Sequence, residues 1–300
     1  MSYNPFDDIQ PPKISEDLIQ KCKETDDYRE ILFEYYKFVG QLVVVCSCLL
    51  YESPAWGGRK RKLWEVCASS FSRIRALMSA NLEFFQDDRY IEASQIIDRC
   101  IFETAAKISW MAQDPTDERL QRYLEGSIRP DREHKALIEA NITDRGNAAL
   151  VIEERMLLRM ERFERLAGMT EVPTKELRRM PDLSVILKEI GHGRGVYIAV
   201  GKVGSHAVHG NWQHLLSQCL TEKNGILCVK HRSAISDPAQ YALISIFVLE
   251  ACDKYVSNCF TDQNFSIAFS SFVRDTQEEI MKWNNISLGN DFEVISPKKK

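Results

Sequence analysis

The sequence predicts an all-α protein, a single multi-helix bundle of about eight to ten helices. Apolar residues recur at the 3.6-residue spacing of a helix, as at Trp64, Phe71, Ile74 and Met78. Residues typical of helix starts and ends separate these stretches. The apolar fraction of 44% and the charged fraction of 27% are ordinary for a globular protein.

The N-terminal third is predicted to form a flexible arm and three helices. Residues 1–14 hold three prolines and show little periodicity, which indicates the arm. A capping-box pattern opens a helix over 27–51, and a Gly-Gly pair follows it. Two further helices are expected over 60–85 and 90–113, joined by a turn short enough to make them antiparallel neighbours.

The middle of the chain is predicted to hold three helices of unequal length. The first covers 116–141, and Pro130 is expected to kink or break it because proline lacks an amide donor. An Arg- and Glu-rich helix over 148–167 follows, with one solvated face. A short helix over 182–190 leads into the glycine-rich turn 191–195.

The C-terminal third is predicted to contain three more helices. The first, 196–219, holds three of the six histidines. Residues 225–229 form either a short strand or an irregular connector. An Asp-Pro helix start at 237–238 opens a helix to about 260, which is apolar on several sides and therefore central. A last helix covers 265–283.

No repeat or linker is visible, so one helical domain is expected over 15–284, between the arm and a polar tail at 285–300. The net charge of −4 provides no overall attraction to nucleic acid or to an anionic membrane. The longest apolar run, 38–51, is shorter than the about 20 residues that span a bilayer, so no membrane association is expected.

The cysteines and the N-terminus favour a cytoplasmic location. Nine cysteines are present, and none is spaced as Cys-x-x-Cys, which argues against a zinc ribbon or a redox dithiol. Most lie in apolar helical stretches, where a free thiol behaves as a small hydrophobic group. No secretory signal is visible at the N-terminus.

The first candidate for a polar site is the pair Arg99 and Glu103. The two residues are four apart on an otherwise apolar helix, so they share one face. Charged groups directed into a core need partners, because burying an unpaired charge is costly. The pair therefore forms either the floor of a polar site or an intrahelical ion pair at the edge of the core.

The second candidate is a set of four polar residues at positions i, i+3, i+4 and i+7. On one continuous helix, Lys202, Ser205, His206 and His209 would present an amine, a hydroxyl and two imidazoles on one face. Histidine titrates near neutral pH and serves as acid, base or metal ligand. This set fits a functional site and a structural polar face about equally well.

Together the two segments resemble a bacterial helical family, domain-of-unknown-function family 5677. The resemblance rests on Arg-x-x-Phe-Glu at 99–103 and Ser-x-x-x-His-Gly at 205–210, and it covers roughly residues 60–260. It implies that Arg99, Glu103, Ser205 and His209 meet in one site. The family supplies no established reaction.

A third candidate is Arg129 followed by four residues and His134. This is the spacing of the metal-independent ribonuclease motif of HEPN-type helical domains. In that chemistry histidine handles the 2′-hydroxyl proton and arginine stabilises charge on phosphate. Pro130 replaces the usual polar residue, which favours a solvated kink instead. A HEPN-like arrangement assembled from Arg99 and His209 is an alternative.

Two further patterns bear on ligands. A metal could take His206, His209 and Glu103, since open zinc sites have three such ligands. A dimetal bundle would need two Glu-x-x-His motifs, and only 189–192 has that spacing, so no metal and no cofactor is expected. A basic run, Arg59, Lys60, Arg61 and Lys62, lies at a helix start; it fits either an anionic partner or plain solvation.

The sequence thus leads to two hypotheses of function. In the first, the protein cleaves phosphodiesters or handles nucleotides in bacterial stress or phage defence, with RNA or a nucleotide as partner. His209 and His206 would act as acid and base, Arg99 would bind phosphate, and Glu103 would orient it. In the second, the protein is a non-catalytic interaction module, with a homo-oligomer or protein partner, whose polar residues form a structural network.

Overall fold

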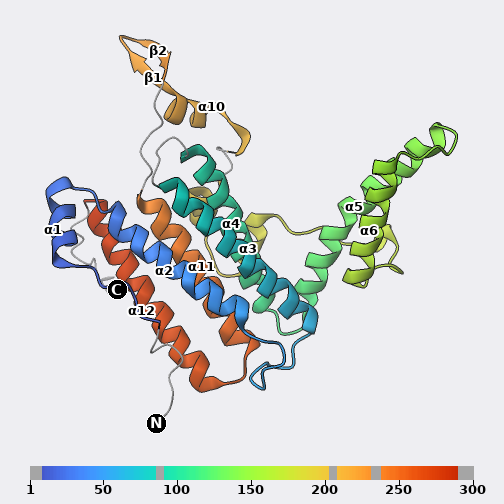
Figure 1. The fold of residues 1–300 in the computed structure, drawn as a ribbon, viewed down its shortest axis with the longest axis horizontal. Coiled ribbons are helices and arrows are strands. Elements are labelled where there is room, and N and C mark those ends of the chain that lie inside the picture. The colour runs from blue at the N-terminus through green and yellow to red at the C-terminus, as the bar shows by residue number, and fades with distance from the viewer. Residues whose placement is uncertain (1–8, 86–90, 203–207, 231–237, 290–300) are drawn as a thin grey trace, which may run out of the picture. The chain divides into compact units, whose positions relative to one another are not determined.

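The computed structural model describes residues 9–85, 91–202, 208–230 and 238–289, and the prediction of an all-α fold is confirmed. In this part of the chain nine α-helices have seven residues or more, beside one two-stranded sheet (Figure 1). The chain divides into two compact units. Unit 1 contains the residues up to Gln113 and from Ile186 onward, and unit 2 contains Asp114–Val185.

The core of unit 1 is built from long helices that pack around α11. This helix contacts α4, α12 and α2, and twelve of its residues are buried, so it is central as its apolar sequence predicts. Figure 1 shows α2, α11 and α12 running alongside one another. The helices of this unit are α1 (Glu16–Thr25), α2 (Arg29–Cys48), α3 (Arg61–Phe85), α4 (Ile91–Ala112), α11 (Pro238–Cys259) and α12 (Gln263–Ser287).

Helix α2 is long and apolar enough, by length and composition alone, to cross a membrane. Its most apolar stretch is 56% buried inside the protein, against the neighbouring helices. Ten of its residues are buried, among them Leu42, Val43 and Cys46, and α3 and α11 lie against it. This burial is that of a core helix.

Unit 2 is a hairpin of two helices, α5 (Glu118–Asp144) and α6 (Val151–Ala167). Of the two expected effects of Pro130, a kink or a break, the break does not occur: α5 continues through the proline. Contacts on both sides of the proline hold the helix. Arg129 Nη1 donates to the Leu177 carbonyl (2.9 Å), and Arg132 Nη2 donates to that of Met169 (2.5 Å). These tertiary contacts outweigh the local cost of the missing amide.

The prediction of one continuous helix over 196–219 is wrong. A π-helix, η3, covers Tyr197–Lys202, and a left-handed Gly210 (φ +53°) ends the next helical turn. The side chain of Asn211 then caps a new turn by accepting from the backbone nitrogen of His214 (3.2 Å). The other elements of this segment are α7 (Leu183–Glu189), α8 (Arg194–Val196), α10 (Trp212–His214) and a second π-helix, η4 (Leu215–Cys219).

A β-hairpin follows, β1 (Leu220–Lys223) paired antiparallel with β2 (Ile226–Val229). The strand alternative for residues 225–229 is therefore the observed one. Asn224 and Gly225 form its turn, both with positive φ (53° and 77°). Asn-Gly is the dipeptide that such two-residue hairpin turns prefer, since both residues tolerate the left-handed region.

Candidate functional site

The predicted pair on α4 forms an ion pair within the helix. Arg99 Nε donates to Glu103 Oε1 at 2.6 Å, and the two side chains are 15% and 33% exposed. Lys107 Nζ lies 3.7 Å from the other oxygen of Glu103. The carboxylate therefore holds a largely enclosed guanidinium in a fixed orientation, as both interpretations of this pair require.

Two hydrogen-bond contacts join the same face of α4 to a later segment of the chain, residues 189–214. Near the helix start, His214 Nε2 lies 3.2 Å from Glu92 Oε1. Near its end, Trp110 Nε1 donates to Glu189 Oε2 at 2.6 Å. Glu92, Arg99, Glu103 and Trp110 recur at helical spacing, and the two ties are 18 residues or about 27 Å apart along the helix.

The segment between Glu189 and His214 is thus fixed to α4 beyond both sides of the Arg99–Glu103 pair. Its π-helix η3 also contacts α4. Within this segment lie the second set of predicted site residues. His209 is exposed to solvent, whereas Ser205, His206 and the side chain of Lys202 lie outside the described residues. The meeting of Arg99 with His209 stays a prediction.

Two histidine–carboxylate pairs were not predicted. His214 is 4% exposed and faces Glu92. His192 Nε2 lies 2.9 Å from Glu250 Oε2 of α11, and its ring packs edge-on against Phe247 at 5.2 Å between centroids. Each pair joins residues far apart in sequence, so no local spacing could have indicated it. The Glu-x-x-His motif at 189–192 does not act as one unit, because its two side chains bind different partners.

A buried carboxyl group, Asp98, lies next to Arg99 in the chain but faces the core. Its side chain accepts from Asn81 Nδ2 at 2.6 Å and from Gln240 Nε2. Asn81 also lies 3.3 Å from the hydroxyl of Tyr36. Burial raises the pKa of Asp98 to about 7, although both hydrogen bonds act to lower it. Burial likewise raises the pKa of Tyr36 well above its usual value.

The basic run at the start of α3 is largely engaged within the protein. Arg59 Nη1 donates to the Ala112 carbonyl (3.3 Å). Lys62 Nζ lies 2.5 Å from Glu65 Oε2, and Arg61 lies 3.5 Å from the other oxygen of Glu65. Arg61 also covers the ring of Tyr51 at 5.3 Å. Arg61 and Lys62 thus share one carboxylate, and the choice between an anionic partner and plain solvation for this run stays open.

The HEPN-like spacing at Arg129 and His134 falls in unit 2. Arg129 is occupied by Glu133 (Nε to Oε1, 3.1 Å) and by the Leu177 carbonyl, while His134 is exposed on the surface of α5. The guanidinium therefore serves the packing of unit 2, which agrees with a structural role for this arginine.

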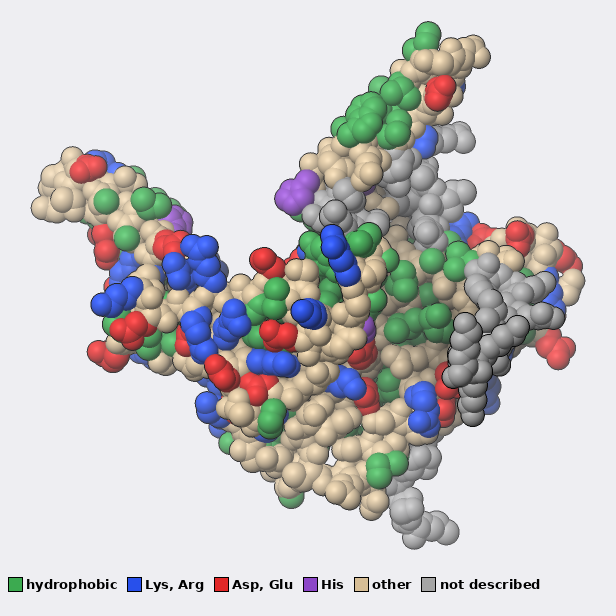
Figure 2. Space-filling view, turned by 180° about the vertical axis from the view of Figure 1, so that it is seen from behind, with side chains coloured by type: hydrophobic (Ala, Val, Ile, Leu, Met, Phe, Trp, Pro, Cys, Tyr) green, Lys and Arg blue, Asp and Glu red, His purple; other side chains and the backbone are tan. Residues whose placement is uncertain are grey.

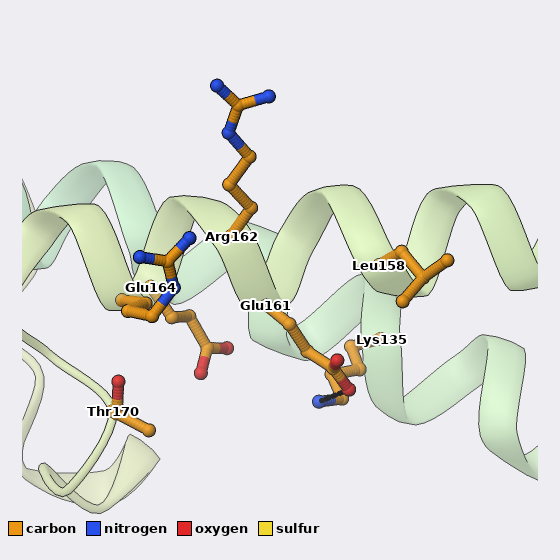
Figure 3. A pocket seen from close by; sticks show the side chains of 7 residues that line it. Lys135, Leu158, Glu161, Arg162, Glu164 and Thr170 are labelled. Atoms are coloured by element: carbon orange, nitrogen blue, oxygen red, sulfur yellow. Dashed lines mark hydrogen bonds and ion pairs between the residues drawn. The ribbon is translucent and has the colours of Figure 1, made fainter.

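An open hollow of about 590 Å³ also lies in unit 2, between α5 and α6 (Figure 3). Figure 3 shows Arg162 pointing away from Lys135 and Glu161, which form an ion pair of 3.2 Å. Glu164 is bound by the buried Arg132 (3.1 Å). The carboxylates of the hollow are thus already paired with cations. Its lining residues are Lys135, Leu158, Glu161, Arg162, Glu164, Arg165 and Thr170.

The described residues offer no ready metal site. No three His, Cys, Asp or Glu side chains among them are close enough to hold an ion. The proposed ligand His206 lies outside these residues, so that particular set is not covered by the statement.

Residues 65–226 match DUF5677, a family of unknown function, and this stretch is more than half of the chain. The chain belongs to this family. The resemblance drawn from the two short motifs is thereby confirmed, over a shorter range than the expected 60–260. Both motifs lie inside the matched stretch of the DUF5677 family, whereas α11 and α12 lie outside it. No curated protein and no solved structure matches the chain.

Proposed function

We propose that this DUF5677 protein cleaves RNA or handles nucleotides at the face of α4 that carries Arg99 and Glu103. The support is the enclosed guanidinium, oriented by a carboxylate at 2.6 Å, on a face along which the segment bearing His209 is attached. A fixed arginine is suited to binding phosphate oxygens in two-point fashion. π-Helical turns such as η3 are frequent beside functional sites.

In the proposed reaction the 2′-oxygen of a ribose attacks the adjacent phosphorus and the bond from phosphorus to the 5′-oxygen breaks. His209, with His206, removes the 2′-hydroxyl proton and returns a proton to the leaving 5′-oxygen. Arg99 neutralises the charge that grows on the phosphate, and Glu103 keeps Arg99 in place. The step needs no metal, and it yields a 2′,3′-cyclic phosphate.

Purified protein is incubated with RNA and, separately, with the same sequence as DNA, in the presence of EDTA. Wild type is expected to cleave RNA alone, and Arg99→Ala and His209→Ala are expected to lose that activity while keeping their melting temperature. His134→Ala is the matched control, since this exposed histidine belongs to the other HEPN-like spacing. Equal inactivity of wild type and both variants on RNA and on nucleotides would refute the proposal.

The non-catalytic alternative has its own support in the two histidine–carboxylate pairs. His192 and His214 each join distant parts of unit 1, which is what a structural polar network does. Under this alternative Arg99→Ala lowers the melting temperature sharply and changes no activity. His209 is exposed, so His209→Ala leaves the melting temperature unchanged under both hypotheses. Its stability therefore does not separate them.

A further inference from the structure

The arm formed by residues 208–230 presents an apolar surface that the described part of the chain does not cover. Figure 2 shows hydrophobic side chains gathered on it. Its sheet contains only β1 and β2 in this part of the structure, and an isolated two-stranded hairpin is marginally stable in water. Six large side chains are 39–66% exposed: Trp212, Leu215, Leu216, Ile226, Leu227 and Val229.

Among the described residues no strand pairs with the outer edge of β2, and apart from its short length of four residues this edge lacks the usual protection. The antiparallel register pairs Lys223 with Ile226 around the two-residue turn, so Ile226 and Cys228 direct their backbone N–H and C=O groups toward β1. The N–H and C=O groups of Leu227 and Val229 therefore point away from β1. Natural edge strands carry charges, proline or a bulge to prevent pairing with another strand. β2 carries neither charge nor proline.

We propose that β2 pairs with β2 of a second copy of this chain, forming one continuous antiparallel sheet across a two-fold axis. The outward-facing groups fix the register. Leu227 exchanges hydrogen bonds with Val229 of the second copy, and the reverse pair repeats this on the other side of the axis. The two Cys228 residues then face each other at the centre, as a non-hydrogen-bonded pair with Cα atoms about 4.5 Å apart.

A second copy fits this edge for two reasons. A two-fold axis brings the same edge to itself, so each outward donor meets an outward acceptor without a separately evolved partner. The area is also sufficient. With about 150 Å² for a fully exposed large side chain, the six side chains offer roughly 500 Å² per copy. Two copies offer at most about 1,000 Å², which is the lower end of the range for a specific interface.

The first experiment measures the molar mass of the full chain by size-exclusion chromatography with light scattering. Wild type is expected to be a dimer. Val229→Pro removes an outward N–H that β1 does not use, so the hairpin tolerates it, and dimerisation should weaken at least about tenfold. Glu222→Pro removes the corresponding outward N–H of β1 and should leave the dimer intact. Ile267→Lys, at an exposed position of α12, controls for the loss of surface hydrophobicity and should leave the dimer intact.

A second experiment tests the register by cross-linking. The exposed thiol of Cys48 is first removed as Cys48→Ser. Diamide then accepts the two protons and two electrons of a pair of Cys228 thiols, whose spacing in the proposed register suits a disulfide. A covalent dimer is expected, and both Cys228→Ser and Val229→Pro should abolish it.

Three results would overturn this proposal. The first is a monomeric wild type, which would leave another protein's strand as the occupant of the edge. The second is a dimer that Glu222→Pro disrupts and Val229→Pro does not, since it would use the β1 edge. The third is a dimer without the Cys228 cross-link, which would have a different register.

Discussion

Replacing Asp98 by asparagine is expected to stabilise the protein at pH 8 and to change how its stability depends on pH. Asp98 is 5% exposed, and the groups that face it are Tyr36 of α2, Asn81 of α3 and Gln240 of α11. Among the described residues no cation contributes to its pKa, which burial raises from 3.8 to about 7. The native state therefore favours the neutral acid.

The sign and size of the effect follow from proton linkage. Between pH 3.8 and 7 the unfolded chain has lost the Asp98 proton while the native state retains it. The free energy of unfolding then falls by about 1.4 kcal/mol per pH unit, and the loss is complete above pH 7. The full penalty is about 4 kcal/mol as an upper bound, of which about 3 kcal/mol arises between pH 5 and 7.

Asparagine matches the neutral acid in shape and carries no charge, so Asp98→Asn removes this penalty. Its new N–H group has a ready acceptor, since the Asn81 side-chain oxygen is buried without a hydrogen-bond partner and a half-turn of that amide presents it to residue 98. Urea unfolding of both proteins is followed by circular dichroism from pH 5 to 8.

The stability gap between variant and wild type should widen by about 3 kcal/mol from pH 5 to 8. Asp275→Asn is the control, because that side chain is 70% exposed on α12 and should show no widening. Two curves that stay parallel over the whole range would refute the assignment of a neutral native Asp98.

Four further substitutions test the packing by urea unfolding. His214→Ala empties a site that is 4% exposed, with an expected loss of about 1–3 kcal/mol from lost packing, since its partner Glu92 is 57% exposed and stays solvated. Gly126→Ala places a Cβ atom 2.6 Å from a backbone nitrogen and should destabilise unit 2 by about 1–3 kcal/mol, whereas Gly40→Ala, with open space around it, should stabilise α2 slightly. Arg132→Ala leaves Glu164 without its cation in an ion pair whose two side chains are each 10% exposed. The free energy of unfolding should fall by about 3–5 kcal/mol, and an unchanged urea midpoint would contradict the role of this ion pair.

The helices that could be predicted are those whose boundaries depend on local chemistry. Helix α11 begins at Pro238 and helix α6 ends at the left-handed Gly168, and both lie where the sequence predicts a helix boundary. Helix α1 was missed because it is short and only Cys22 is buried, so it leaves little periodic signal.

The segment 196–219 does not form the predicted continuous helix because its backbone chemistry interrupts it. Gly210 adopts a left-handed conformation, and the asparagine after it caps a new turn. This Gly-Asn pair was visible in the sequence and indicates a helix boundary. The Asn224–Gly225 turn was equally visible, but each flanking strand has only four residues.

The candidate site shows the same division between local and distant contacts. The Arg99–Glu103 pair follows from i,i+4 spacing alone. The contacts that attach the later segment to α4 join residues 122 and 79 positions apart, and no spacing rule reaches so far. The position of that segment depends on tertiary packing, which local sequence patterns do not predict.

The neighbours Asp98 and Arg99 show how one turn of α4 can serve stability and function separately. Successive residues of a helix point about 100° apart, so Asp98 faces the core while Arg99 lies on the face that also carries Glu92 and Trp110, the residues that contact the later segment. If the proposed function is correct, Asp98→Asn alters stability and leaves RNA cleavage unchanged, whereas Arg99→Ala does the reverse. A common loss of both properties in Arg99→Ala would instead assign this face of α4 to the structural network.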